Sequence, residues 1–251
     1  MVKIIFCGCF GRMGNAVRQI VKDSSDAEIV AGVDICDGAA EFPVYKSIAD
    51  VKEAADVIID FSSPKALDSI LECSISKNIP LVLCTTGFSD EQLEQIKKAS
   101  EKVAILRSAN MSLGINTVAK LIQTAAQILA DNGYDIEIVE RHHNQKKDAP
   151  SGTALLLADA INSSCDGRYE YVYDRSGRRE ARPKNEIGIS AVRGGSIVGD
   201  HEIIFAGLDE VVEIKHTAYS RNVFAKGAVS AAEFLAGKSA GMYTMSDVVG
   251  A

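Results

Sequence analysis

Apolar runs alternate with helical patterns through the first part of the chain. Val2–Cys7 is apolar apart from Lys3, which predicts a strand that is buried on both faces. After a glycine-rich break, apolar residues recur at helical spacing from about Asn15 to Lys22, and Glu28–Asp34 again has the pattern of a strand. A strand, a helix and a second strand in this order predict one βαβ unit.

The same alternation continues beyond this unit. Strands are predicted at Asp56–Phe61, Pro80–Cys84 and Val103–Leu106, and helices are predicted to begin at Ser63 and Ser89. Strands that alternate with helices are typical of a parallel sheet with right-handed crossovers and helices on both faces. The pattern therefore predicts a Rossmann-like, doubly wound α/β fold.

The pattern of apolar and polar residues changes after Asn110. A long helix over about 112–130 is predicted there, and partial alternation further on indicates a sheet with one exposed face. The later elements are a strand at Asp135–Glu140, a helix from Ser151 to about Asn162, strands near Ile187–Val192, Ile197–Phe205 and Val211–Tyr219, and a helix at Asn222–Leu235. We expect a dinucleotide-binding domain over 1–110 and 220–251, and an α+β domain with a mixed sheet, for substrate binding and oligomerisation, over 111–219.

Charge and length exclude several classes of protein. The chain has 251 residues, 34 acidic and 27 basic side chains, and a formal net charge of −7. An acidic chain is repelled by nucleic acids and anionic membranes, so neither is an expected partner. The apolar runs are far shorter than the roughly 20 residues of a membrane helix, and Met1–Gly8 does not fit an export signal. We therefore expect a cytoplasmic protein.

The cysteines add no chemistry to this picture. Six are scattered along the chain, and disulfides are unusual in the cytosol. Cys7 and Cys9 form the one close pair, but the Cys-x-x-Cys spacing and second cluster of a zinc site are missing. We expect small apolar packing residues and no metal site.

A glycine turn joins the first strand to the first helix. Its spacing is Gly8-x-x-Gly11-x-x-Gly14, a variant of the pattern that lets a backbone approach a pyrophosphate at a helix start. Asp34 ends the second strand, where a carboxylate can accept hydrogen bonds from the ribose hydroxyls of a dinucleotide. The alternative is a purely structural turn followed by an exposed aspartate.

The residues after Asp34 bear on the choice of cofactor. A site for NADP needs a basic group that neutralises the 2′-phosphate, and neither Ile35 nor Cys36 supplies one. The carboxylate also repels that phosphate, so NADH is favoured. Arg12 is the one group in the turn that would still permit NADPH.

The most informative stretch is the loop between Glu140 and Ala154. It combines His142, His143 and Lys146 with a predicted helix start at Ser151. The free N–H groups of a helix start, here those of Gly152 and Thr153, suit a carboxylate, and histidine or lysine can supply a proton to a reaction nearby. Three alternatives remain: the histidines bind zinc, the loop is only solvated, or Ser151 is only a helix cap.

Taken together, these motifs resemble those of the 4-hydroxy-tetrahydrodipicolinate reductases, also called dihydrodipicolinate reductases, from Val2 to about Val248. The matching segments are Gly8-x-x-Gly11-Arg12-Met13-Gly14, Glu140-x-His142-His143-x-x-Lys146-x-Asp148-Ala149-Pro150-Ser151-Gly152-Thr153-Ala154 and Val192-Arg193-x-Gly195-x-Ile197-Val198-Gly199-x-His201. The resemblance implies an NAD(P)H-dependent reduction, with loss of water, of a cyclic unsaturated dicarboxylate in the diaminopimelate and lysine pathway. It also implies a homotetramer.

The resemblance further implies roles for individual residues. His142 would be the acid/base residue and Lys146 the proton donor, while His143, Ser151, Gly152, Thr153 and Arg193 would hold the substrate. The cofactor would contact Gly8, Gly11, Arg12, Met13, Gly14, Asp34, Phe61, Thr85, Thr86, Gly87, Ala109, Asn110 and Met111. Phe10 departs from the family's usual small residue and is expected to narrow the space beside the pyrophosphate.

Two other functions are compatible with a dinucleotide-binding domain. Another two-domain amino-acid dehydrogenase would share the glycine turn but would not need the His142-His143-x-x-Lys146 pattern, and a non-catalytic NAD(H)-sensing module would bind the cofactor without turnover. His201 lies in a predicted strand and is expected to be structural. The segment 167–185 is expected to be a mobile, solvated loop, and its basic residues are Arg175, Arg178, Arg179, Arg182 and Lys184.

Overall fold

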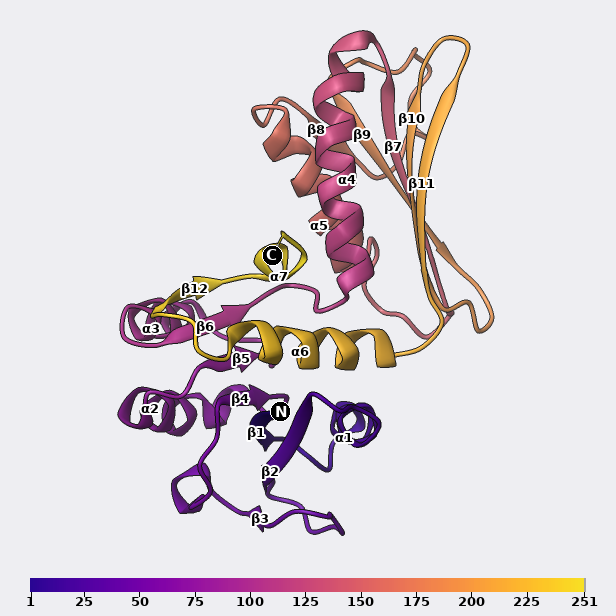
Figure 1. The fold of residues 1–251 in the computed structure, drawn as a ribbon. Helices are drawn as coiled ribbons and strands as arrows, with labels where there is room; N and C mark the ends of the chain where they lie inside the picture. The colour runs from indigo at the N-terminus through magenta and orange to yellow at the C-terminus, as the bar shows by residue number, and fades with distance from the viewer. Residues whose placement is uncertain (251) are drawn as a thin grey trace. The chain divides into compact units, whose positions relative to one another are not determined.

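The computed structural model describes residues 1–250, and the chain forms two compact units (Figure 1). The first unit consists of Met1–Leu113 and the described residues from Arg221 onward, and the second is Gly114–Ser220. Among residues 1–250, none of the helices has the length and apolar character needed to cross a bilayer.

A seven-stranded parallel sheet forms the centre of the first unit. Its order, β12-β6-β5-β4-β1-β2-β3, has the doubly wound arrangement in which the chain reverses direction beside β1. The strands are β1 (Val2–Cys7), β2 (Ala27–Val33), β3 (Val44–Tyr45), β4 (Val57–Asp60), β5 (Leu81–Leu83), β6 (Ala104–Arg107) and β12 (Gly241–Tyr243). This confirms the predicted fold class, although β3 and β12 were not predicted.

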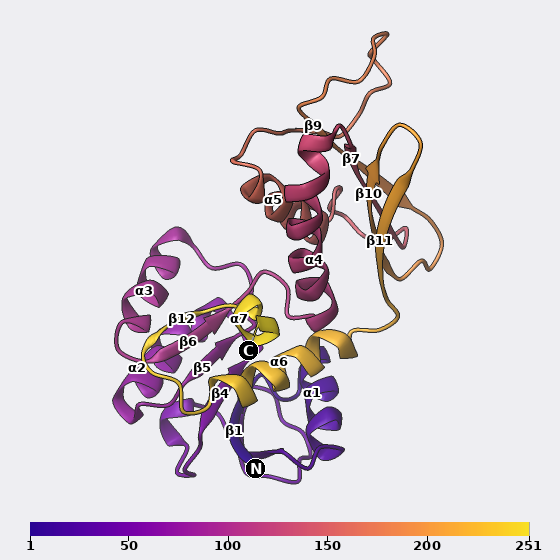
Figure 2. The same cartoon turned by 45° about the horizontal axis from the view of Figure 1, so that its top comes forward.

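Helices cover both faces of this sheet (Figure 2). On one face, Ile4 and Phe6 of β1 pack with α1 (Arg12–Lys22) and α6 (Asn222–Leu235). On the other face, Ile5 and Cys7 pack with α2 (Leu67–Lys77) and α3 (Asp90–Ser100). Because successive residues of a strand point to opposite faces, β1 needs an unbroken apolar run to bury both.

Local signals in the sequence fix the start of α3. Ser89 Oγ accepts a hydrogen bond from the backbone N–H of Gln92 at 3.3 Å, and the Gln92 side chain accepts one from the Ser89 N–H at 3.1 Å. This reciprocal pair is a capping box, and it satisfies two N–H groups that would otherwise lack partners. The predicted helix start at Ser89 is therefore confirmed.

The second unit contains a mixed, five-stranded sheet in the order β11-β10-β7-β9-β8. Strands β7, β9 and β8 run parallel, while β10 is antiparallel to both of its neighbours. The elements are α4 (Leu113–Leu129), β7 (Asp135–His142), α5 (Gly152–Ser164), β8 (Glu170–Val172), β9 (Glu186–Arg193), β10 (Gly199–Ala206) and β11 (Val211–Ala218). The short helix α7 (Met245–Gly250) belongs to the first unit and was not predicted.

Both α4 and α5 lie on the same face of this sheet (Figure 1). Ile136 and Ile138 of β7 and Ile203 and Phe205 of β10 point to the helices and are fully buried. The residues between them, such as Glu137, point to the opposite face. This alternation agrees with the predicted α+β unit.

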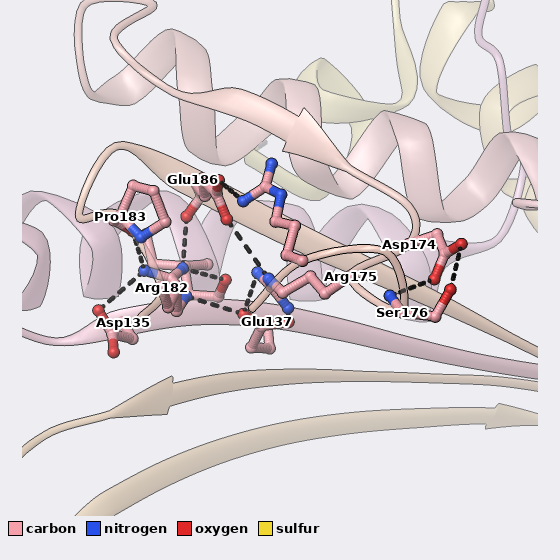
Figure 3. A network of polar contacts seen from close by, with 10 residues as sticks. Asp135, Glu137, Asp174, Arg175, Ser176, Arg182, Pro183 and Glu186 are labelled. Carbon is pink, nitrogen blue, oxygen red and sulfur yellow. Dashed lines mark hydrogen bonds and ion pairs between the residues drawn. The ribbon is translucent and has the colours of Figure 1, made fainter. Parts of the chain in front are cut away.

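The Arg-rich segment is held against the sheet, which corrects the expectation of a solvated loop (Figure 3). Arg175 Nη2 donates to Glu137 Oε1 at 2.8 Å, and Arg182 Nε donates to the same oxygen at 2.9 Å. Glu186, which is almost fully buried, accepts from both Arg175 and Arg178. The sequence pattern could not show these pairs because the acidic partners lie on β7 and β9.

Arg182→Met is expected to lower the free energy of unfolding by about 2 kcal/mol. The guanidinium is 17% exposed and also donates to Asp135 Oδ1 and to the backbone oxygen of Ile136, so methionine would leave several acceptors without a partner. Urea unfolding would measure the change. Arg179→Met is the matched control, since Arg179 is exposed. Equal midpoints for the two variants would contradict the structural role of Arg182.

Candidate active site

The residues predicted to bind a dinucleotide lie in loops at one edge of the seven-stranded sheet. Each loop follows the carboxyl end of a parallel strand, and the strands are neighbours in the sheet. The glycine turn follows β1, Asp34 follows β2, Phe61 follows β4, the segment 85–87 follows β5 and the segment 109–111 follows β6. This edge is where open α/β sheets bind their ligands.

Two glycines of the turn are required by close approaches of the backbone. Gly8 has φ of +82°, and a Cβ atom there would lie 2.7 Å from the backbone oxygen of Phe61. A Cβ atom on Gly14 would lie 2.5 Å from the backbone oxygens of Gly8 and Cys9. Helix α1 begins at Arg12, not at the predicted Asn15, because Gly14 allows its first turn to pack on the end of β1.

A cavity of about 530 Å³ opens beside this turn. Of the predicted residues, Gly8, Gly11, Asp34 and Phe61 line it. Its size and its glycine wall fit the adenosine and phosphate part of a dinucleotide.

The other predicted cofactor residues lie outside the lining of this cavity. Arg12 is exposed, Met13 packs against the apolar core, and Thr85 is buried while Thr86 and Gly87 are exposed. Ala109 is exposed and Asn110 is buried, and its side chain accepts a hydrogen bond from the N–H of Ser112. Met111 is 6% exposed and lies in the core, where its backbone oxygen packs against Gly227.

The carboxylate of Asp34 is held by the backbone of two loops. Oδ2 accepts from the N–H of Phe10 at 2.8 Å, and Oδ1 accepts from the N–H of Cys36 at 2.9 Å. A carboxylate has about four acceptor positions, so two remain for ribose hydroxyls. The Phe10 ring packs against Gly38 with the Arg18 guanidinium 5.5 Å from its centre, and it also lines the cavity.

In the second unit, a buried glutamate connects the motif residues. Glu140 lies near the end of β7 and is fully buried. Its Oε2 lies 2.6 Å from His142 Nδ1, and its Oε1 accepts from the Ser151 N–H at 2.9 Å. Arg193 on β9 donates to both oxygens at 2.7 Å. Sequence reasoning assigned no role to Glu140, although it stands two positions before His142 and therefore on the same face of the strand.

Charge keeps this glutamate ionised and orients the histidine. Burial alone would raise the pKa of Glu140, but hydrogen bonds from Arg193, His142 and the Ser151 N–H outweigh it and hold the pKa below its ordinary value of 4.5. An ionised carboxylate only accepts, so a proton lies on His142 Nδ1 and Nε2 is the ring nitrogen left for other contacts. A Cβ atom on Gly199 would lie 3.5 Å from this Nε2, so the glycine keeps the space beside it open.

Arg193 binds a carboxylate of the chain itself, that of Glu140. Besides the bidentate contact with Glu140, Nη1 donates to the backbone oxygen of Val192 and Nη2 donates to the backbone oxygen of Asp148. All four Nη hydrogens therefore have partners within the chain. The structure therefore shows Arg193 bound to Glu140, and the contact with a substrate carboxylate stays a prediction.

Ser151, just before α5, and His201, on β10, contact the same cluster of residues. Ser151 Oγ accepts from the Ala154 N–H at 3.1 Å and lies 2.8 Å from His201 Nε2, so Ser151 is a helix cap. The His201 ring lies edge-on to His142, with the ring centres 5.2 Å apart. Burial lowers the pKa of His201 to about 4, so this imidazole is neutral near pH 7. His201 is buried within the strand β10, as expected of a structural residue.

Lys146 lies in the loop between β7 and α5. Its Nζ lies 2.9 Å from Asp148 Oδ2, and the lysine side chain is 21% exposed. The hydrogen bond from Lys146 holds the pKa of Asp148 below its ordinary value. His143 is exposed in the same loop, Gly152 is exposed at the first position of α5, and Thr153 is partly buried. Among residues 1–250, no group of three histidine, cysteine or acidic side chains is placed to hold a metal ion.

Comparison with known families covers nearly the whole chain. Residues 2–111 match the model described as "Dihydrodipicolinate reductase, N-terminus", and residues 114–249 match "Dihydrodipicolinate reductase, C-terminus". The chain belongs to the dihydrodipicolinate reductase family. This is a family of NAD(P)H-dependent reductases, so the resemblance seen in the motifs is confirmed.

Individual members of the dihydrodipicolinate reductase family are similar to this chain over nearly its whole length. The chain is 51% identical over 249 residues to the 4-hydroxy-tetrahydrodipicolinate reductase of Caldanaerobacter subterraneus subsp. tengcongensis, covering 99% of this chain and 98% of that protein. It is 50% identical over 250 residues to that of Clostridium novyi, with the same coverage. A dipicolinate-bound dihydrodipicolinate reductase from Paenisporosarcina sp. TG-14 superposes with a TM-score of 0.80 at 25% identity, covering 97% of each chain.

Proposed function

We propose that this chain is a 4-hydroxy-tetrahydrodipicolinate reductase of the diaminopimelate and lysine pathway, with NADH favoured over NADPH. The observation that carries the proposal is the Glu140 carboxylate that holds His142 in one tautomer, close in sequence to Lys146 and the start of α5. Two supporting facts are the match to both family models and the whole-length relatives named for this activity.

The substrate is a dianion, so it needs at least two sites for carboxylates. Gly152 and Thr153 are the first residues of α5, whose positive dipole end favours an anion, and Lys146 offers a positive charge in the preceding loop. His143 is exposed in that loop and adds a further donor. The Paenisporosarcina reductase binds dipicolinate, which is a ligand of this chemical class.

The chain's own residues would supply orientation and protons. His142 Nε2 is the acid/base nitrogen during loss of water from the 4-hydroxy substrate, because Nδ1 is held by Glu140. Lys146 donates the proton that completes tetrahydrodipicolinate. The nicotinamide cofactor, bound at Gly8, Gly11 and Asp34, would supply the hydride that the ring accepts at C4.

The direct experiment follows NADH absorbance with substrate freshly made by the preceding synthase. We expect turnover that pyridine-2,6-dicarboxylate inhibits in competition with the substrate. NADH binding without turnover would contradict the proposal and favour the non-catalytic sensing module. Turnover with an amino acid in place of the dicarboxylate would favour the rival dehydrogenase class.

We further propose a homotetramer. Helices α4 and α5 cover one face of the five-stranded sheet, and the Arg-rich segment covers part of the other; Val139 and Ile204 are partly exposed on this second face, where a second copy would pack. Light scattering should then give a mass near four times 26.8 kDa. A monomer mass at micromolar concentration would contradict this part of the proposal.

A further inference from the structure

A lysine reaches the cavity of the first unit from a strand that was not predicted. Strand β3 pairs in parallel with β2, with Tyr45 opposite Val33, and the Asp34 N–H donates to the Tyr45 oxygen at 3.0 Å. Lys46 follows Tyr45 just as Asp34 follows Val33, so the two side chains start from the same edge of the sheet. Both line the cavity of about 530 Å³.

The ammonium group of Lys46 lies against the loop that follows Asp34. Its Nζ donates to the backbone oxygens of Ile35 and Cys36 at 3.0 and 3.1 Å, and to Asp37 Oδ1 at 2.6 Å. The Asp37 side chain is 96% exposed, and the Lys46 side chain is 58% exposed. The third partner of the ammonium is therefore a carboxylate at the surface, which solvent or another anion can replace.

This arrangement changes the charge beside the expected ribose. Ile35 and Cys36, which follow Asp34 in the sequence, carry no positive charge, but the fold adds the Lys46 cation to the lining of the cavity that Asp34 also lines. A phosphate on the ribose 2′-oxygen needs such a cation, and lysine binds phosphate as a point charge. Arg12, the other candidate, lies outside the lining of this cavity.

We propose that Lys46 and Asp37 together set the preference between NADH and NADPH: Lys46 is the cation available to the 2′-phosphate, and Asp37 competes with that phosphate for it. The inference rests on the proposed use of a nicotinamide cofactor and names the residues that decide between its two forms. With NADH bound, Asp37 stays on Lys46. With NADPH bound, the 2′-phosphate takes the place of the Asp37 carboxylate.

Replacing the Asp37 carboxylate on Lys46 by the 2′-phosphate costs little free energy because exposed ion pairs are weak. Asp37 nevertheless remains charged at neutral pH, since the hydrogen bond from Lys46 holds its pKa below the ordinary value. The carboxylate therefore opposes NADPH binding throughout the physiological range. Added salt screens this competition and should narrow the difference between the two cofactors.

The test measures dissociation constants for NADH and NADPH by fluorescence titration, and for 2′,5′-ADP by calorimetry. Asp37→Asn is expected to tighten NADPH and 2′,5′-ADP by about three- to tenfold, because the amide no longer competes for the ammonium. Lys46→Met is expected to weaken both by about tenfold or more, because the phosphate loses a charge-assisted hydrogen bond. NADH should change by less than about twofold in either variant.

A matched ion pair provides the control. Lys22 Nζ lies 2.6 Å from Glu41 Oε1, both side chains are exposed, and neither lines the cavity beside the glycine turn. Lys22→Met and Glu41→Gln make the same changes of charge in the same unit. Both variants should leave the ratio of the NADPH and NADH dissociation constants unchanged, which would separate a local effect from one of net charge.

Two results would overturn the inference. If Lys46→Met weakens NADH and NADPH equally, Lys46 only holds the loop after Asp34. If Asp37→Asn leaves NADPH affinity unchanged, Asp37 does not compete for the cation. Failure of the proposed function looks different, because the unmodified chain would then bind neither nucleotide or would bind NADH without reducing the substrate.

Discussion

Replacing Lys146 by alanine is expected to lower kcat by about 100- to 10,000-fold, with little change in NADH affinity. The lysine is mostly buried in the loop before α5 and is oriented by Asp148. It belongs to the second unit, whereas the residues that line the cavity beside the glycine turn belong to the first. Loss of the ammonium therefore removes the proposed proton donor without touching the cofactor site. Steady-state kinetics and a fluorescence titration with NADH measure the two effects separately.

Two further variants distinguish proton donation from a general effect of charge. Lys147→Ala makes the same change of charge at the next residue, which is exposed, and should retain most of the activity. Lys146→Arg keeps the positive charge but replaces the donor with a group that does not deprotonate in proteins. If Lys146→Arg restores normal kcat, Lys146 is a substrate anchor and not the proton donor.

The doubly wound sheet could be predicted because its signal is local. A strand buried on both faces is apolar at nearly every position, and β1 apart from Lys3 and β4 apart from Asp60 show this in continuous runs. The edge strands β3 and β12 gave no such signal. They are two and three residues long and partly exposed, so they are too short to show a period and need no continuous apolar run.

The site could be predicted only where its residues are close in sequence. His142, Lys146 and Ser151 share one loop and one helix start, so their motif is visible in the chain. The partner of Glu140 is Arg193, 53 residues away, and the two meet because β7 and β9 pair with His142 opposite Arg193. The sequence could not show the contact between Arg193 and Glu140 because it does not supply this register.

Contacts between residues far apart in the sequence also explain why the surroundings of two basic residues, Arg182 and Lys46, could not be predicted. Arg182 is expected in solvent, yet three of its acceptors lie on β7. The cation in the cavity that Asp34 lines could not be predicted because Lys46 follows the short strand β3. A basic residue in a polar segment has the same pattern whether it is solvated or paired. Only strand pairing decides which carboxylate it meets.

Glu140→Gln is expected to lower kcat by about 100- to 10,000-fold, although Glu140 itself need not touch the substrate. An amide can present either an oxygen or an N–H group to His142 Nδ1, so the imidazole is no longer held with Nε2 as its free nitrogen. Hydrogen bonds from Arg193, His142 and the Ser151 N–H hold the pKa of Glu140 below its ordinary value of 4.5, so the native carboxylate is ionised at neutral pH. The variant therefore lacks a negative charge over the whole working range. Its pH profile of kcat/KM should move towards lower pH, since a neutral amide stabilises a protonated imidazole less well.

A loss of stability alone would not move a pH profile, and a second glutamate of the same strand provides the control. Glu137 also binds two arginines, Arg175 and Arg182, but it lies on the opposite face of β7. Glu137→Gln should lower the free energy of unfolding and leave the pH profile unchanged. If Glu140→Gln does not fold, Glu140→Asp keeps the charge on a shorter side chain, and it should lower kcat without moving the profile. A Glu140→Gln enzyme with the native kcat and profile would show that the carboxylate does not orient His142.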